Sequence, residues 1–275
     1  MWLILILICR SILSVNMKVI VVGYKGLVGS AFCRYFSRMS QAVIAVGREE
    51  MHAISGAECD LLVLALGNAN KGFAGQYPAK DFDASVASVA HYVHAIKAKK
   101  TVLISSVDVY SHTSSSDSTK ENAEIDPAQQ HVYGFHKYLA EQIVLKFSAS
   151  AMVVRLPGLL GPGLTKNPVF DYFNPNKKLF VSSESKLNFI YTDDIPVHVN
   201  RLLNTGFKGV VNVAANNSVR IADLAALGGY PCVYNEGAAN NIQCYKINTT
   251  LLSQYGQLNT SESAILRYKA MLAEE

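Results

Sequence analysis

Short apolar runs alternate with segments of helical spacing along the first 160 residues of the chain. Each run is almost continuous in apolar residues, as a strand buried on both faces should be: residues 19–22, 43–46, 61–66, 101–105 and 151–156. Helical spacing covers residues 27–39, 79–98 and the segment from Tyr133 to Phe147, whereas residues 106–128 are polar and predict a loop. This alternation predicts an α/β fold built on a doubly wound parallel sheet of the Rossmann type.

The pattern changes after Pro157, where glycine and proline residues interrupt the chain. One further strand is predicted over residues 210–213, and helices over 221–227 and 262–272. We therefore expect a dinucleotide-binding domain over residues 17–157. Residues 158–275 are expected to complete the sheet and to form a small C-terminal substrate lobe.

Residues 1–16 stand apart from this plan. The apolar run 2–8 is too short to span a membrane, which takes about 20 apolar residues, and it lacks the positive residues that open a secretory signal. Residues 17–23 have the character of the first strand of a nucleotide-binding domain, which starts near an N-terminus. We interpret residues 1–16 as an extension upstream of a true start at Met17; the alternative is a membrane anchor.

A glycine-rich turn lies between the first predicted strand and the first predicted helix. Gly23, Gly26 and Gly29 have the spacing that dinucleotide-binding turns use. The first glycine permits a tight turn, the second lets a pyrophosphate approach the backbone, and the third lets helix and strand pack closely. We assign residues of this turn and of later strand ends to a cofactor site: Gly23, Lys25, Gly26, Leu27, Val28, Gly29, Arg48, Leu66, Lys137 and Pro157.

The end of the second strand bears on the choice between NAD and NADP. An acidic residue there would bind the ribose hydroxyls of NAD, whereas Arg48 is suited to pair with a 2′-phosphate. Glu49 and Glu50 follow directly and oppose that pairing. The cofactor is expected to be NADP or NAD, with NADP favoured.

Tyr133 and Lys137 are one helical turn apart, so they project from the same face. A phenol titrates near ~10 and is a poor base at neutral pH. A neighbouring ammonium favours the phenolate and lowers the pKa. Together with Ser106 at the end of the fourth strand, the pair predicts an acid–base site.

Several motifs occur together in one order along the chain: Gly23-x-x-Gly26-x-x-Gly29, Ser105-Ser106-Val-Asp-Val-Tyr110, Glu121-Asn122 through Pro127, Tyr133-Gly-Phe-His-Lys137, Arg155-Leu-Pro-Gly-Leu-Leu-Gly161-Pro162-Gly163 and Asn188-Phe-Ile-Tyr-Thr-Asp193-Asp194. In this combination the chain resembles the extended short-chain dehydrogenase/reductase family, in its NAD-dependent epimerase/dehydratase branch. The resemblance covers about residues 17–260.

The resemblance implies roles for three residues. Tyr133 would be the acid/base for a sugar hydroxyl or ketone, Lys137 would lower its pKa and hold the nicotinamide ribose, and Ser106 would hydrogen-bond the reacting oxygen. The implied substrate is a nucleotide-activated sugar. Relatives commonly pair through two helices from each subunit, so a homodimer is expected through residues 79–98 and 130–148.

Three activities remain open within the resemblance. A 4-keto reductase is favoured by Arg48 and the short lobe, and an NAD(P)-retaining epimerase is the alternative. A dehydratase ranks lower because Asp108 is a single acidic residue without an obvious second. A non-catalytic NAD(P) sensor belongs to a different class, but such proteins often lose the tyrosine or the lysine, and both are present.

The chain departs from the family at two places. Gly158 stands where the family usually carries an asparagine that helps to bind the substrate's diphosphate. The segment between the second and third apolar runs is also too short to hold a further strand of the usual pattern. Substrate identity is therefore less well determined than cofactor binding.

Composition and charge limit the remaining possibilities. Of the 275 residues, 50% are hydrophobic and 17% charged, which suits a globular protein with a large core. The net charge of +4 comes without a long basic run, so neither nucleic acid nor a membrane is an expected partner. His91 and His94 lack further metal ligands, and we predict no metal site. The five scattered cysteines predict free thiols in the cytoplasm.

Overall fold

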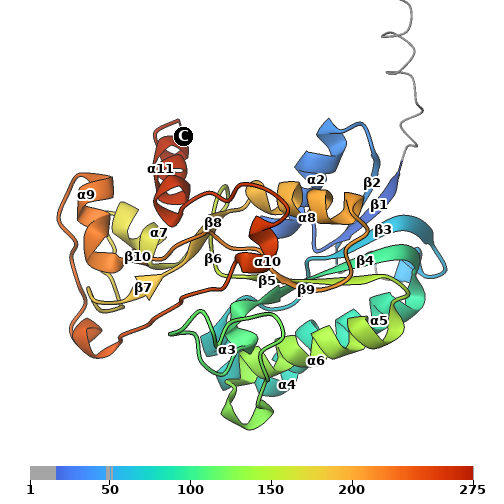
Figure 1. Ribbon diagram of the computed structural model, residues 1–275, viewed down its shortest axis with the longest axis horizontal. Helices are drawn as coiled ribbons and strands as arrows, with labels where there is room; N and C mark the ends of the chain where they lie inside the picture. Colours follow the sequence, from blue (N-terminus) through green and yellow to red (C-terminus); the bar gives the residue numbers. More distant parts are fainter. Residues whose placement is uncertain (1–16, 48–49, 51, 275) are drawn as a thin grey trace, which may run out of the picture.

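The computed structural model describes residues 17–47, 50 and 52–274 (Figure 1). Within these residues, six parallel strands form one sheet in the order β2-β1-β3-β4-β5-β9. Their bounds are β1 Lys18–Val22, β2 Ala42–Val46, β3 Glu58–Leu64, β4 Lys97–Ser106, β5 Ala151–Leu156 and β9 Gly209–Asn212. The parallel α/β sheet predicted from the apolar runs is thus confirmed.

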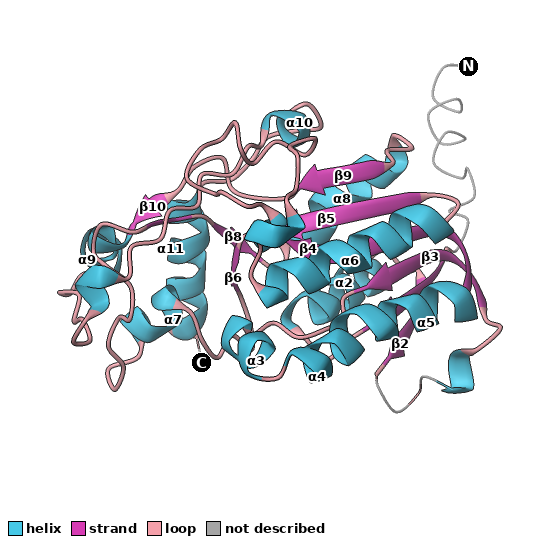
Figure 2. Ribbon diagram, turned by 90° about the horizontal axis from the view of Figure 1, so that it is seen from below, coloured by secondary structure: helices cyan, strands magenta, loops and turns pink. Residues whose placement is uncertain are grey.

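Helices cover both faces of the sheet (Figures 1 and 2). On one face lie α2 (Leu27–Arg38) and α8 (Asp194–Asn204), and on the other lie α5 (Ser88–Ala95) and α6 (Val132–Phe147). Phe32 and Phe36 of α2 are fully buried against the strands. Burial of apolar surface on both faces, at roughly 25 cal/mol per Å², is the main stabilisation of this layered core.

The predicted helix over residues 79–98 is built differently from the prediction. It consists of α4 (Pro78–Phe82), a π-helical turn η2 (Asp83–Ala87) and α5, which ends at Ala95. Residues 97 and 98 were wrongly placed in this helix, because Lys97 and Ala98 pair with Glu58 and Cys59 at the start of the β3–β4 ladder. The short helix α3 (Lys71–Gln76) was not predicted.

The connection between β2 and β3 is short, as the sequence indicated. Val21 of β1 pairs with Ala45 of β2 on one side and with Val63 of β3 on the other, so no strand lies beyond β2 among the described residues. A single 3₁₀ turn, η1 (His52–Ile54), leads into β3. The sheet is therefore one strand shorter at this edge than the family pattern would give.

A small lobe faces the carboxyl edge of the sheet, at the left of Figure 1. Its core includes Leu160, Phe189, Ile265 and Tyr268. The lobe contains β6 (Gly158–Leu160), α7 (Pro168–Phe173), β7 (Lys186–Leu187), β8 (Phe189–Tyr191), β10 (Val219–Arg220), η5 (Ile221–Asp223), α9 (Leu224–Gly228), η6 (Ala238–Asn240) and α11 (Ser261–Leu272). The other elements after residue 157, namely α8, β9 and α10 (Thr250–Ser253), pack with the main sheet.

Two 3₁₀ turns lie in the long segment between β4 and α6, which was predicted as a loop. They are η3 (Val107–Val109), directly after β4, and η4 (Pro127–Gln129), shortly before α6. The rest of the segment is irregular and is tied to the C-terminal half of the chain. Thr119 Oγ1, for example, donates to the Lys246 carbonyl oxygen at 2.8 Å.

A buried ion pair joins α6 to β5 beneath the carboxyl edge. Arg155 donates to Glu141 from Nε at 3.1 Å and from Nη2 at 2.7 Å, and both side chains are almost completely buried. Ser105 Oγ of β4 donates to the same carboxylate. The Arg155 guanidinium also lies 4.7 Å from the centre of the Tyr110 ring. The pair therefore fixes the position of α6 relative to β4 and β5.

No helix among the described residues is long and apolar enough to cross a membrane. Both interpretations of residues 1–16, as an upstream extension or as a membrane anchor, lie outside the described residues.

Substitution Glu141→Gln is expected to destabilise the fold by about 3–5 kcal/mol, because it leaves the Arg155 charge buried without a counter-charge. Chemical denaturation of both proteins measures the difference. The control is Glu58→Gln, which breaks the exposed Lys97–Glu58 pair and should have a much smaller effect. Equal effects of the two substitutions would contradict the assigned role of the buried pair.

Candidate active site

The glycine turn connects β1 to α2 and is held by very close backbone contacts. Gly23 has φ +85°, and a Cβ atom there would lie 2.2 Å from the Ala65 carbonyl oxygen. A Cβ on Gly29 would lie 2.2 Å from the Gly23 carbonyl oxygen. Both positions therefore require glycine because of the protein's own packing.

Gly26 differs from its two neighbours in the motif. It is the N-cap residue of the twelve-residue helix α2, and a Cβ there would meet only the Gly23 carbonyl oxygen, at 3.4 Å. No side chain caps the helix, and Lys25 beside it is exposed. Leu27 and Val28 begin the helix. An open glycine over free N–H groups fits the pyrophosphate of a dinucleotide.

The turn after β3 lies between the glycine turn and α6 and is close to both. Its residues include Leu66, which packs against the core beneath the sheet edge, and Gly67. A Cβ on Gly67 would lie 3.3 Å from Lys137 Nζ. Pro157 follows β5, whose last residue, Leu156, pairs with Ser106. The cofactor-site residues assigned from the sequence and described here thus lie along one edge of the sheet.

The residue assigned to a 2′-phosphate, Arg48, lies outside the described residues. The turn after β2 is described at Gly47 and Glu50, where a Glu50 carboxylate oxygen accepts a hydrogen bond from the Gly47 N–H at 2.8 Å. A carboxylate is therefore present at the end of β2.

Ser106 and Tyr133 meet where β4 ends and α6 begins. Ser106 is the last residue of β4, and its hydroxyl lies near enough to the Tyr133 phenol to act on the pKa of that phenol. Gly134 makes this approach possible, because a Cβ there would lie 2.1 Å from the Asp108 carbonyl oxygen. Lys137 Nζ lies 5.8 Å from the centre of the Tyr133 ring. The structure thus brings together the three residues predicted to be catalytic.

Burial dominates the titration of both groups in α6. Burial, and then the Asp108 carboxylate, raise the pKa of Tyr133 well above its ordinary value, while the hydrogen bond with Ser106 lowers it. The net direction is opposite to the lowering expected from Lys137. Burial lowers the pKa of Lys137 itself to about 8. Tyr133 is therefore a protonated phenol at neutral pH.

Asp108 forms a polar cluster beside Ser106 that the sequence did not reveal. Its Oδ2 accepts from Ser106 Oγ at 3.0 Å, and its Oδ1 accepts from Lys71 Nζ at 2.6 Å and from Tyr245 Oη at 2.7 Å. Lys71 Nζ also donates to Tyr245 Oη at 2.8 Å. Burial and the Asp108 carboxylate raise the pKa of Tyr245 to about 12.

The packing of the lobe explains why residue 158 is a glycine. A Cβ at this position would lie 2.7 Å from the ring of Phe189 and 3.0 Å from the Asn188 carbonyl oxygen. An asparagine side chain, which the family usually carries here, would collide with that buried ring. In this chain the Phe189 ring occupies the space that a side chain at position 158 would need, which explains the departure seen in the sequence.

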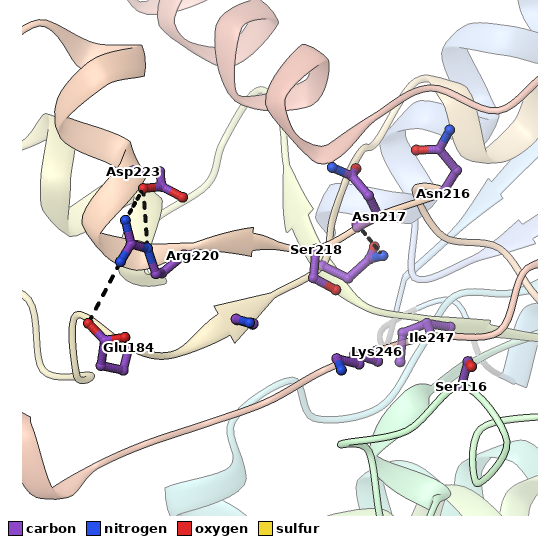
Figure 3. Close-up of a pocket in the computed structure, with 11 residues that line it drawn as sticks. Ser116, Glu184, Asn216, Asn217, Ser218, Arg220, Asp223, Lys246 and Ile247 are labelled. Carbon is purple, nitrogen blue, oxygen red and sulfur yellow. Dashed lines mark hydrogen bonds and ion pairs between the residues drawn. The ribbon is translucent and has the colours of Figure 1, made fainter.

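A polar groove of about 700 Å³ lies in the C-terminal half of the molecule (Figure 3). It is lined by Ser116, Glu184, Lys186, Asn188, Asn216, Asn217, Ser218, Arg220, Asp223, Lys246 and Ile247. Arg220 is paired with Asp223 and Glu184. Lys246 directly follows Tyr245 in an extended segment, residues 243–248, that we call the strap. Lys246 and Ile247 of the strap line the groove and Tyr245 contacts Asp108, so the strap borders both the groove and the Asp108 cluster.

Among the described residues, no group of three or more histidine, cysteine, aspartate or glutamate side chains is arranged to hold a metal ion.

Solved structures with this fold include enzymes of sugar-nucleotide metabolism. A UDP-galactose 4-epimerase matches with TM-score 0.76 and 19% identity, over 94% of this chain and 99% of that one. A dTDP-4-dehydrorhamnose reductase from Bacillus anthracis, in complex with NADP, matches with TM-score 0.77 and 16% identity, over 93% and 99%. A UDP-glucuronic acid 4-epimerase from Bacillus cereus matches with TM-score 0.77 and 15% identity, over 94% and 99%.

No curated protein matches the sequence. The model of the NAD-dependent epimerase/dehydratase family, however, matches residues 19–214, which include the glycine turn, Ser106, Tyr133 and Lys137. That span is most of the chain and contains the strands and helices that build the sheet edge. The chain therefore belongs to the NAD-dependent epimerase/dehydratase family, an extended short-chain dehydrogenase/reductase family of sugar-nucleotide-modifying enzymes.

Proposed function

We propose that this protein is an NAD(P)-dependent oxidoreductase acting on a nucleotide-activated sugar, as a 4-keto reductase. The observation that carries the proposal is the convergence of Ser106, Tyr133 and Lys137 at the sheet edge that also holds the open Gly26 turn. A bound nicotinamide would supply or accept the hydride. The protein would supply the proton and the position of the substrate.

Tyr133 is suited to donate a proton. Its pKa lies above the ordinary value of a phenol, so it carries its proton at neutral pH. Reduction of a carbonyl needs an acid at the developing alkoxide oxygen. The Ser106 hydroxyl, which lies near Tyr133, would bind the same oxygen. The Lys137 ammonium would hold the cofactor ribose and stabilise the phenolate that remains.

The surroundings of Asp108 favour reduction over dehydration. A dehydratase would need a second carboxylate beside this acid. The side-chain partners of the Asp108 carboxylate, among the described residues, are Ser106, Lys71 and Tyr245. The alternative that stays closest to the site is an epimerase that retains NAD(P), because it uses the same three residues without net redox change.

A nucleotide-activated sugar is proposed as the substrate because of the family and of the structural neighbours. One neighbour is a 4-epimerase solved with a UDP-sugar analogue and NAD, and another is a dTDP-sugar reductase. In this chain the Phe189 ring fills the place of a side chain at Gly158. The diphosphate would therefore be bound by groups other than residue 158.

We also propose a homodimer and a cytoplasmic location. Helices α5 and α6 pack side by side, and the segments around them expose large apolar side chains: Phe82, Leu145 and Phe147. An exposed apolar helix face is typical of a subunit interface. The described cysteines, Cys33, Cys59, Cys232 and Cys244, are free thiols, which suits a reducing compartment.

Substitution Tyr133→Phe should lower turnover by about 10²–10⁴, the usual contribution of a positioned acid, while cofactor binding stays intact. The assay combines NADPH oxidation with product analysis on a panel of 4-keto and 4-hydroxy nucleotide sugars. Product formation without net oxidation would identify an epimerase. Absence of any turnover by the wild-type protein, with cofactor bound, would favour the sensor alternative.

Substitution Gly26→Ala should leave the fold intact and weaken cofactor binding by about tenfold or more, because the methyl group would occupy the place of the pyrophosphate. Gly29→Ala is the matched control, and it should instead lower the melting temperature because its Cβ collides with the Gly23 carbonyl oxygen. Cofactor titration and thermal unfolding are measured for both. Unchanged cofactor affinity in a folded Gly26→Ala protein would refute the assigned pyrophosphate site.

Substitution Arg48→Ser should weaken NADPH binding by about tenfold and change NADH binding much less, because the guanidinium is proposed to pair with the 2′-phosphate. The ratio of the two dissociation constants, measured at fixed salt, is the readout. Glu50→Gln is expected to shift that ratio the other way, because it removes a negative charge at the end of β2. An unchanged ratio in Arg48→Ser would argue against NADP preference.

A further inference from the structure

A buried carboxylate lies behind α6 and has no place in the chemistry described so far. Asp81 of α4 is fully buried. Its Oδ2 lies 2.6 Å from His136 Nδ1, and its Oδ1 accepts from Asn68 Nδ2 at 2.8 Å and from Ser85 Oγ at 3.4 Å. A carboxylate only accepts hydrogen bonds, so the Nδ1–H of His136 is the donor, and a neutral imidazole suffices.

This network lies beside Lys137. His136 directly precedes Lys137 in the Tyr-Gly-Phe-His-Lys motif. Ser85 Oγ and Lys137 Nζ both border Gly67, since a Cβ on that glycine would lie 3.0 Å from the first and 3.3 Å from the second. Asn68 follows Gly67, and its N–H donates to Ser85 Oγ at 3.1 Å. Asp81 and Lys137 thus belong to one packed unit.

The charges around Lys137 come from several elements. On α6 itself lie Tyr133, His136 and Glu141, and α4 contributes Asp81. Glu141 forms an ion pair with Arg155 of β5, and Asp108 of η3 forms an ion pair with Lys71 of α3. Asp81 is therefore the carboxylate beside Lys137 whose described partners are a histidine, an amide and a hydroxyl, with no lysine or arginine among them.

Lys137 needs a nearby negative charge to remain protonated. Its ammonium is buried, and burial favours the neutral amine. Asp81 and Glu141 act against burial, and the resulting pKa of Lys137 is about 8. Without the Asp81 charge, a large fraction of Lys137 would be uncharged at neutral pH.

We propose that Asp81, held in place by His136, is a positioning residue whose buried negative charge keeps Lys137 in its ammonium form. The inference rests on the proposed function, because the ammonium is the form that would bind the cofactor ribose and support Tyr133. His136 acquires a role as well: its Nδ1–H donates the hydrogen bond that holds the carboxylate in place.

The test is the pH dependence of NADPH and NADH binding to the purified protein, followed by nicotinamide fluorescence between about pH 6.5 and 9.5. For the wild type, affinity should fall as pH rises through about 8, because the ammonium loses its proton there. Asp81→Asn should move this midpoint down by about one pH unit or more. Asp83→Asn, an exposed carboxylate two residues further on, is the matched control and should leave the midpoint unchanged.

Two further variants assign the titration. Lys137→Met should abolish the pH-dependent step in cofactor affinity. The double variant with Asp81→Asn should then show the same pH-independent affinity profile as Lys137→Met alone. Should Asp81→Asn fail to fold, His136→Leu replaces it. That variant removes the hydrogen bond that holds the Asp81 carboxylate and favours its ionised form, so the midpoint should fall.

Three results would overturn the inference. They are an unchanged midpoint in a folded Asp81→Asn protein, a pH-dependent step that persists in Lys137→Met, or a midpoint in His136→Leu that stays or rises. Uniformly weaker binding of Asp81→Asn at every pH would show a structural role only. Failure of the wild type to bind either cofactor at any pH is a separate outcome, and it would refute the proposed function together with this inference.

Discussion

The ion pair between Glu141 and Arg155 is the constraint on which the active site depends. Tyr133, Lys137 and Glu141 follow one another at intervals of four residues on α6, so the anchored residue and the two reacting residues share a face. The pair is bidentate, buried and joined by Ser105 of β4. Loss of either partner would leave the other as an uncompensated buried charge. The geometry of the pair therefore fixes α6 against β4, and with it the meeting of Tyr133 and Ser106.

Burial has a second consequence, which shapes the chemistry. Removing water from around Tyr133 and Lys137 favours the uncharged form of each, a phenol and an amine. A phenol is useful to a reductase, but an amine is not useful for holding a ribose and a phenolate. Both groups are therefore best served by a nearby negative charge that keeps the proton in place. Asp108 lies near the phenol and Asp81 near the amine, and each carboxylate opposes loss of the neighbouring proton.

The sequence predicted the parts of this site that depend on local spacing. The glycine turn and the Tyr133–Lys137 pair are readable because each occupies one turn, and neighbouring strands and helices supply their context. The Asp108 cluster was not readable, since Tyr245 lies 137 residues away in the chain and Lys71 lies in a short helix without clear periodicity. Gly158 was recognised as a departure, but its cause, the Phe189 ring, is a tertiary contact.

The fold alone does not choose among the activities, since an epimerase and a reductase match the chain almost equally well, with TM-scores of 0.76 and 0.77. The choice is made by side chains that come from both halves of the molecule. Lys71 belongs to the sheet side and Tyr245 to the strap, and the two meet on Asp108 next to Ser106. The catalytic surroundings therefore exist only when lobe and sheet are assembled. The boundary predicted at residue 157 therefore does not divide the candidate site.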